Sequence, residues 1–197
     1  YRPGFISKGA KAVRCVGRLA LFHYIDEIIV RLQDAISKAI DVNASMGFQS
    51  RSAKVYIVAS LCGGTGSGMF LDMAYIARDL FMQRVPVTYV TGLLVMPDAF
   101  EPLFTSLSTT RRARANTYAA CKTLDHYMYH RDFQMRYSDT YAISLPSGQR
   151  PFDICYLLGS TNENHQNVGS INDLGGQVAE ELSLGKHHPP RRQEALQ

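Results

Sequence analysis

The chain has 197 residues, of which 46% are hydrophobic, and its formal net charge is +4. This is enough apolar material for one sizeable core, so we expect one domain, over residues 1–184, rather than two. No apolar run approaches the length of about 20 residues that a membrane span needs, and no signal-peptide pattern is present. The composition therefore argues against a membrane span and against export.

The chain contains four cysteines, Cys15, Cys62, Cys121 and Cys155. They form no CxxC pair, and three of them lie inside apolar periodic segments. Such cysteines are typical of small buried side chains in a reducing compartment. We therefore expect the protein to be cytoplasmic.

The first half of the chain predicts a helix, a strand and a second helix. Apolar residues recur at helical spacing from Val16 to Ile36, and a polar linker is expected over 41–52. Val55 to Ala59 is a short continuous apolar run, typical of a strand that is buried on both faces. After a glycine-rich run, apolar residues from Phe70 to Phe81 again recur at steps of three and four, which predicts the second helix.

The second half continues the alternation of strands and helices. The expected elements are a strand from Val87 to Met96 closed by Pro97, a helix from about Thr109 to Tyr129, a strand from Phe152 to Leu158, and a helix opened by Ser170 and Asp173 that runs to about Leu184. His187 to Arg192 contains two prolines and cannot continue a helix, so 185–197 is expected to be a disordered or truncated tail.

Alternating strands and long helices predict an α/β fold with a mainly parallel sheet. Ligands of such sheets bind where the strands have their carboxyl ends. Two candidate segments lie at such ends, Ser60 to Gly68 and Gly159 to Asn162. We expect them to line one crevice.

The glycine-rich run, Cys62-Gly63-Gly64-Thr65-Gly66-Ser67-Gly68, predicts a phosphate-binding loop. Glycine allows the backbone to approach a ligand closely, and the first N–H groups of the following helix favour an anion. A P-loop is excluded, because Met69 and Phe70 stand where a lysine and a Ser or Thr would follow the last glycine. A dinucleotide-binding GxGxxG loop is disfavoured, because Met69 takes the place of its third glycine.

The glycine run resembles the signature of the tubulin and FtsZ superfamily, which wraps the phosphates of a guanine nucleotide. Gly9 to Arg18, with a Gly-Ala opening and a later Val-Gly-Arg, is similar to the FtsZ segment that senses the terminal phosphate. The amino-acid sequence from Ser60 to Asp72 most resembles that of the bacterial tubulin-like branch. The resemblance covers about Lys8 to Leu184 and implies a Rossmann-like three-layer sandwich that is incomplete at both ends.

The resemblance also implies a set of site residues. The residues expected to bind the nucleotide phosphates are Gly63, Gly64, Thr65, Gly66, Ser67, Gly68, Gly9, Ala10 and Arg112, with Arg114 as the alternative arginine. Asn162 is expected to read the guanine base, with Asn164 or Asn167 as alternatives if the loop register differs. The implied cofactor is GTP or GDP, with Mg²⁺ as an optional companion. Catalytic residues are not assigned.

Three functions remain open from the sequence. The first is a GTP-dependent filament former when the protein is complete, with this chain alone inactive. The second is a nucleotide-binding scaffold that does not hydrolyse or polymerise, and the third is a nicotinamide-dependent enzyme. A metal site at His126 and His130 is disfavoured because a third ligand is missing, and nucleic-acid binding by the arginines at 111, 112 and 114 is disfavoured because no aromatic residues are interleaved with them. Asn116 is expected to be a buried, hydrogen-bonded amide, with a nucleotide contact as the alternative.

Overall fold

The computed structural model describes residues 9–47, 51–130, 133–161 and 171–184. The elements and their bounds are α1 (Arg14–His23), α2 (Ile25–Ser45), β1 (Ser52–Ser60), α3 (Thr65–Met82), β2 (Val87–Val95), the 3-10 helix η2 (Pro97–Leu103), α4 (Leu107–His130), β3 (Ile154–Leu158) and α5 (Ile171–Leu184).

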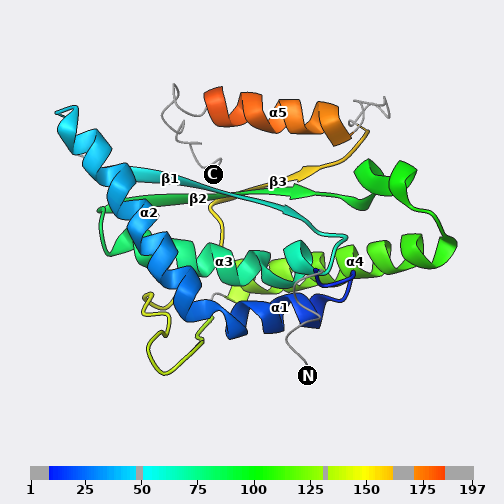
Figure 1. Ribbon diagram of the computed structural model, residues 1–197, viewed down its shortest axis with the longest axis horizontal. Coiled ribbons are helices and arrows are strands. Elements are labelled where there is room, and N and C mark those ends of the chain that lie inside the picture. Colours follow the sequence, from blue (N-terminus) through cyan, green and yellow to red (C-terminus); the bar gives the residue numbers. More distant parts are fainter. Residues whose placement is uncertain (1–8, 48–50, 131–132, 162–170, 185–197) are drawn as a thin grey trace, which may run out of the picture.

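The three described strands form one parallel sheet in the order β1-β2-β3. Val55 of β1 is aligned with Val90 of β2, and Gly92 of β2 is aligned with Cys155 of β3. Figure 1 shows α1, α3 and α4 on one side of this sheet and α5 on the other. The predicted α/β fold with a parallel sheet between helical layers is confirmed. Because all strands run the same way, their carboxyl ends meet at one edge of the sheet.

The main core lies between the sheet and the helices α3 and α4. Val90 and Leu94 of β2 are fully buried there, and the ring of Tyr75 from α3 stacks on Phe133 with 4.1 Å between ring centroids. A second cluster joins α1 and α2 to α3 and contains Leu21, Ile25, Ile29, Ile36, Ile76, Leu80 and Tyr137. Helix α3 belongs to both clusters and is therefore fixed on both flanks.

A buried arginine ties α3 to β2 and to the residue that precedes β3. The guanidinium of Arg78 pairs with the carboxylate of Asp153 at 2.7 Å and donates to the carbonyl oxygen of Thr88 at 3.2 Å. The same carboxylate oxygen of Asp153 accepts the backbone N–H of Val90 at 2.7 Å. This network sets the position of α3 along the sheet, and with it the position of the helix N-terminus.

The prediction that β1 is buried on both faces is wrong. Val55, Ile57 and Ala59 pack against the core, but Val58, which faces the other side, is 52% exposed. Tyr156 of β3 lies on that same face and is also exposed. The apolar run arises because one face is packed by helices, whereas the described residues cover the other face only in part.

The predicted N-terminal helix differs from the structure in two ways. The chain breaks at Tyr24 into α1 and α2, and α2 extends to Ser45, into the part that was predicted as a polar linker. No glycine or proline stands at Tyr24, so the apolar periodicity continues through the break. The strand predicted from Phe152 begins at Ile154, and Phe152 is instead a buried core residue stacked beside Phe70. The segment that begins at Pro97 forms the 3-10 helix η2.

Candidate phosphate-binding site

The glycine run divides between a loop and the first turn of a helix. Strand β1 ends at Ser60, and α3 begins at Thr65. Gly64 is the N-cap residue of α3, and no side chain caps this end of the helix. The first N–H groups of a helix have no partner within it, and together they carry about half a positive charge. The carboxyl end of β1 therefore leads directly to backbone donors that favour an anion.

Gly64 and Gly66 are among the glycines of the run that are needed because other parts of the chain come very close. A Cβ atom on Gly66 would lie 2.5 Å from the carbonyl oxygen of Ser60, at the end of β1. A Cβ atom on Gly64 would lie 2.5 Å from the backbone nitrogen of Val13. Neither glycine has a positive φ, so clearance rather than left-handed geometry is what these positions require. A Cβ atom on Gly63, in contrast, would meet no atom within 4 Å, so the space above this residue is open.

The segment from Gly9 to Val13 packs against the glycine run in an unusual backbone conformation. Gly9, Lys11 and Ala12 all have positive φ, at 77°, 46° and 57°. Such angles cost about 1–3 kcal/mol for a residue other than glycine and persist where neighbouring structure enforces them. Ala10 is buried, accepts a hydrogen bond from the Val13 N–H at 2.9 Å, and lies beside Gly64. The two segments that are expected to bind the phosphates are thus brought together.

Asn116 of α4 joins these two segments. Its side-chain amide donates to the carbonyl oxygen of Ala12 at 2.9 Å and to that of Cys62 at 3.0 Å. The expectation of a hydrogen-bonded amide is confirmed, although the side chain is only half-buried. Its role as a connection between the two loops was not predicted, because no sequence pattern shows which backbone groups an asparagine will reach.

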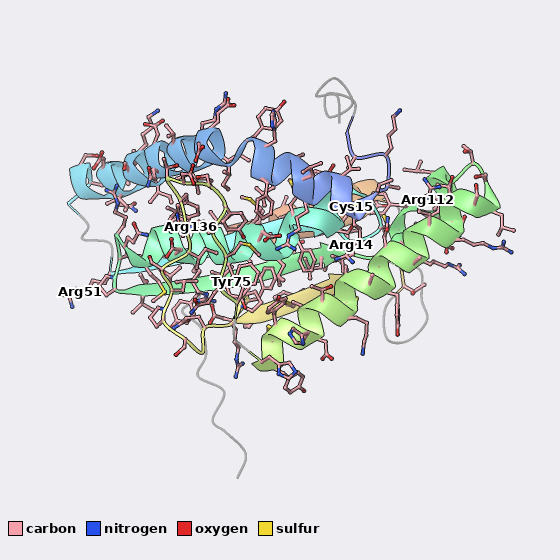
Figure 2. The ribbon with its side chains drawn as sticks, turned by 90° about the horizontal axis from the view of Figure 1, so that it is seen from below. Arg14, Cys15, Arg51, Tyr75, Arg112 and Arg136 are labelled. Atoms are coloured by element: carbon pink, nitrogen blue, oxygen red, sulfur yellow. The ribbon has the colours of Figure 1, made fainter. Side chains whose placement is uncertain are left out.

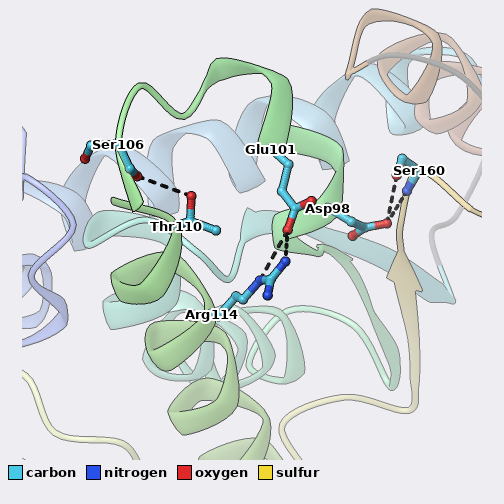
Figure 3. A network of polar contacts seen from close by, with 6 residues as sticks. All are labelled: Asp98, Glu101, Ser106, Thr110, Arg114 and Ser160. Carbon is cyan, nitrogen blue, oxygen red and sulfur yellow. Dashed lines mark hydrogen bonds and ion pairs between the residues drawn. The ribbon is translucent and has the colours of Figure 1, made fainter. Parts of the chain in front are cut away.

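The two candidate arginines of α4 differ in their surroundings. Arg114 forms an ion pair with Glu101 of η2 at 2.5 Å (Figure 3). Arg112 is exposed and makes no ion pair within the described residues. It precedes Asn116 by one helical turn and so lies on the same side of α4 as the residue that contacts the glycine loop. Of the two arginines, Arg112 is the one whose charge is not paired within the described residues.

Ser67, which was expected to bind the phosphates, and Asp72, which follows it in α3, both point into the protein. Ser67 is buried, and its hydroxyl donates to the carbonyl oxygen of Gly63. Asp72 lies five residues further along α3. It is buried, forms a two-bond ion pair with Arg18 of α1 at 2.9 and 3.0 Å, and accepts a hydrogen bond from the Tyr137 hydroxyl at 2.7 Å. Burial is the main cause of the raised pKa of Tyr137, and the adjacent carboxylate raises it further.

The carboxyl ends of β2 and β3 are joined by a contact that the sequence did not predict. Asp98, in the first turn of η2, accepts the backbone N–H of Ser160 at 2.6 Å and its hydroxyl at 3.0 Å (Figure 3). The carboxylate also leaves no room for a side chain at Gly159. The sequence signal that could have indicated this contact is the position of Asp98, an acidic residue directly after Pro97, just past the end of β2. Asn162, expected to read the base, lies outside the described residues, as do Asn164 and Asn167.

Other candidate chemistry finds little support in the geometry. The rings of His126 and His130 lie 4.3 Å apart. Among the described residues, no group of three or more His, Cys, Asp or Glu side chains could hold a metal ion. No described helix is long and apolar enough to cross a membrane.

Comparison with known proteins agrees with this arrangement. No curated protein matches the chain. A family model described as tubulin-like matches residues 2–189, which is most of the chain. The matched region includes the Gly9–Val13 segment, the glycine loop, the parallel sheet and α4. The chain is therefore a member of the tubulin-like family.

Proposed function

We propose that this chain binds the phosphates of GTP or GDP at the N-terminus of α3. It would do so as part of the GTPase domain of a bacterial tubulin-like protein that assembles into filaments in the cytoplasm. The observation that carries the proposal is the uncapped start of α3 beneath the open space at Gly63, next to the strained Gly9–Val13 segment. Backbone donors at a helix N-terminus suit phosphate oxygens.

Each group of the proposed site has its own role. The backbone N–H groups of Gly63 to Ser67 bind phosphate, and the Gly9–Ala10 segment lines the same site. Arg112 supplies a positive charge from α4, and Asn162 reads the guanine base, a role that rests on the sequence resemblance to FtsZ alone. A Mg²⁺ ion would be held chiefly by phosphate oxygens and water, as is common for nucleotide-bound magnesium.

A side chain at Gly63 tests the phosphate site without disturbing the fold. Gly63→Val places its side chain in open space above the helix N-terminus, where the phosphates would lie. We expect it to weaken binding of a fluorescent GTP analogue by at least about tenfold, because a phosphate cannot approach the donors. The measurement is a titration of the full-length protein, with circular dichroism as the test of folding.

Gly175→Val is the matched control. Gly175 lies in α5, far in sequence from the loop, and a Cβ atom there would likewise meet no atom within 4 Å. The change should leave nucleotide affinity unaltered. Unchanged affinity in a folded Gly63→Val variant would contradict the phosphate assignment, and equal affinity of the wild type for ATP and GTP would contradict the guanine assignment.

A further inference from the structure

A cavity lies along the flank of α3 and reaches Ser67 and Gly68 in the first turn of this helix. This cavity of about 360 Å³ opens between α1, α3 and α4. Its wall contains Arg14, Cys15 and Arg18 from α1, Leu71 and Asp72 from α3, and Tyr127 from α4, with Phe133 beyond that helix. This volume falls within the range of small-molecule sites, which are mostly apolar with a few convergent polar groups.

The cavity holds more positive than negative charge. Arg18 is paired with Asp72: although burial opposes its charge, the hydrogen bond and charge of this carboxylate raise the pKa of Arg18. Arg14 has no such acidic partner among the described residues, and its Nε donates instead to the carbonyl oxygen of Ser67 at 3.1 Å. Burial lowers the pKa of Arg14, and the neighbouring Arg18 lowers it further.

The position of Arg14 suits recognition of an anion. Its Nε is held by the backbone of α3, which fixes the plane of the guanidinium, and Figure 2 shows the side chain between α1 and α4. A half-buried cation beside a second cation is disfavoured until an anion joins it. The planar fork of arginine binds carboxylate or phosphate through two parallel hydrogen bonds.

The rest of the wall suits an apolar body attached to that anion. Tyr127 and Phe133 present aromatic rings, 5.2 Å apart between centroids and nearly perpendicular, and Leu71 adds an aliphatic surface. Aromatic rings prefer such edge-to-face or offset neighbours. An aromatic ligand would therefore find a matching surface next to the guanidinium.

We propose that this cavity binds a small organic anion, with its carboxylate or phosphate on Arg14 and an aromatic or apolar body against Tyr127 and Phe133. This site does not require nucleotide binding at the start of α3. The proposal of an anion in the cavity and the proposal of a nucleotide at the glycine loop are therefore tested independently. Ser67 and Gly68 also line the cavity, so the ligand would contact the first turn of α3.

Cys15 provides a reporter of occupancy. Cys15 is exposed and lines the cavity, whereas Cys62 is buried. Burial raises the pKa of the Cys121 thiol, and it raises the pKa of the Cys155 thiol to about 12. Iodoacetamide should therefore alkylate Cys15 ahead of the other three. The experiment measures the rate of Cys15 alkylation by mass spectrometry in the presence of phenyl phosphate, benzoate, inorganic phosphate or benzyl alcohol.

We expect phenyl phosphate or benzoate, at about 5 mM, to slow alkylation about sixfold if the dissociation constant is about 1 mM. The stronger of the two identifies the preferred anionic group. Inorganic phosphate lacks the apolar body and benzyl alcohol lacks the charge, so each should protect less. Arg14→Gln should abolish protection, whereas Arg111→Gln, which alters an exposed arginine of α4, should retain it.

Thr123→Phe is the second variant, and it fills the cavity from α4 while keeping Arg14. Circular dichroism establishes that each variant is folded, and loss of protection in a folded Thr123→Phe or Arg14→Gln variant supports the site. No protection of the wild type, equal protection in folded Arg14→Gln, or equal protection by benzyl alcohol would each overturn the proposal.

Discussion

Asn116 is the residue on which the geometry of the candidate phosphate site most depends. Its amide donates to two carbonyl oxygens on separate segments, Ala12 and Cys62. Both segments contribute to the proposed phosphate-binding site, and the first of them contains residues with unfavourable φ angles. A single side chain from α4 thus keeps the strained segment and the glycine loop at a constant separation.

Replacing Asn116 by alanine should loosen both loops. The change removes two hydrogen bonds and leaves two carbonyl oxygens without this donor, so we expect a loss of about 1–3 kcal/mol in the free energy of unfolding. Nucleotide affinity should fall as well, because the site is no longer held in its binding geometry. Urea denaturation and nucleotide titration of Asn116→Ala provide the two measurements.

The control for this prediction lies on the same helix. Tyr118 of α4 is 71% exposed, so Tyr118→Ala should change stability by no more than about 0.5 kcal/mol and leave affinity unaltered. If Asn116→Ala were as stable as the wild type and bound nucleotide equally well, the amide would have no positioning role.

At the scale of elements, the start of α3 is positioned by close contact with α1. Gly17 of α1 faces the N-cap of α3, and a Cβ atom on Gly17 would lie 2.9 Å from the Cα atom of Thr65 and still closer to the carbonyl group of Gly64. Glycines thus allow the backbones of the two helices to touch. The Arg18–Asp72 ion pair then joins the same two helices further along.

Gly17→Ala should therefore destabilise the protein, even though alanine is the better helix former. In an open helix the change would stabilise by about 0.5–1 kcal/mol, but here the added methyl group must push α1 away from α3. Gly175→Ala in α5, where the added methyl group would meet no atom within 4 Å, is the matched control. We expect opposite signs for the two changes in denaturation midpoint, and a stabilised Gly17→Ala variant would show that the helices do not touch.

At the scale of the whole molecule, the described residues offer donors for a phosphate but no free carboxylate beside them to orient a water. Asp72, the acidic residue that follows the glycine run in α3, is occupied by Arg18 and Tyr137. Hydrolysis needs a positioned nucleophile as well as a bound phosphate. We propose that another subunit supplies this nucleophile-orienting group, and on that proposal residues 1–197 alone would not turn GTP over.

In the full-length protein, GTP hydrolysis should rise more steeply than in proportion to protein concentration. This follows if the missing group comes from a neighbouring subunit in a head-to-tail filament. Steady-state assays over a range of concentrations, paired with sedimentation, measure it. Turnover by the chain alone, or a specific activity independent of concentration, would argue against a shared site. Binding without turnover or sedimentation would favour the scaffold.

Much of the architecture could be predicted because it follows from local patterns. Apolar runs of strand length, separated by segments of helical period, predicted β1, β2, α3 and α4 and hence a parallel sheet. The run of glycines and small hydroxyls identified the loop, since few other residues allow such close backbone approach. These are properties of neighbouring residues, so the sequence by itself determined them.

The tertiary structure decided what each side chain meets. The exposed face of β1 and the inward turn of Asp72 depend on which helices cover the sheet and on Arg18, which is distant in sequence. The same holds for the two carbonyl groups bound by Asn116. Periodicity reports the residues along one element, whereas burial and pairing depend on contacts between elements, and only the folded chain brings those together.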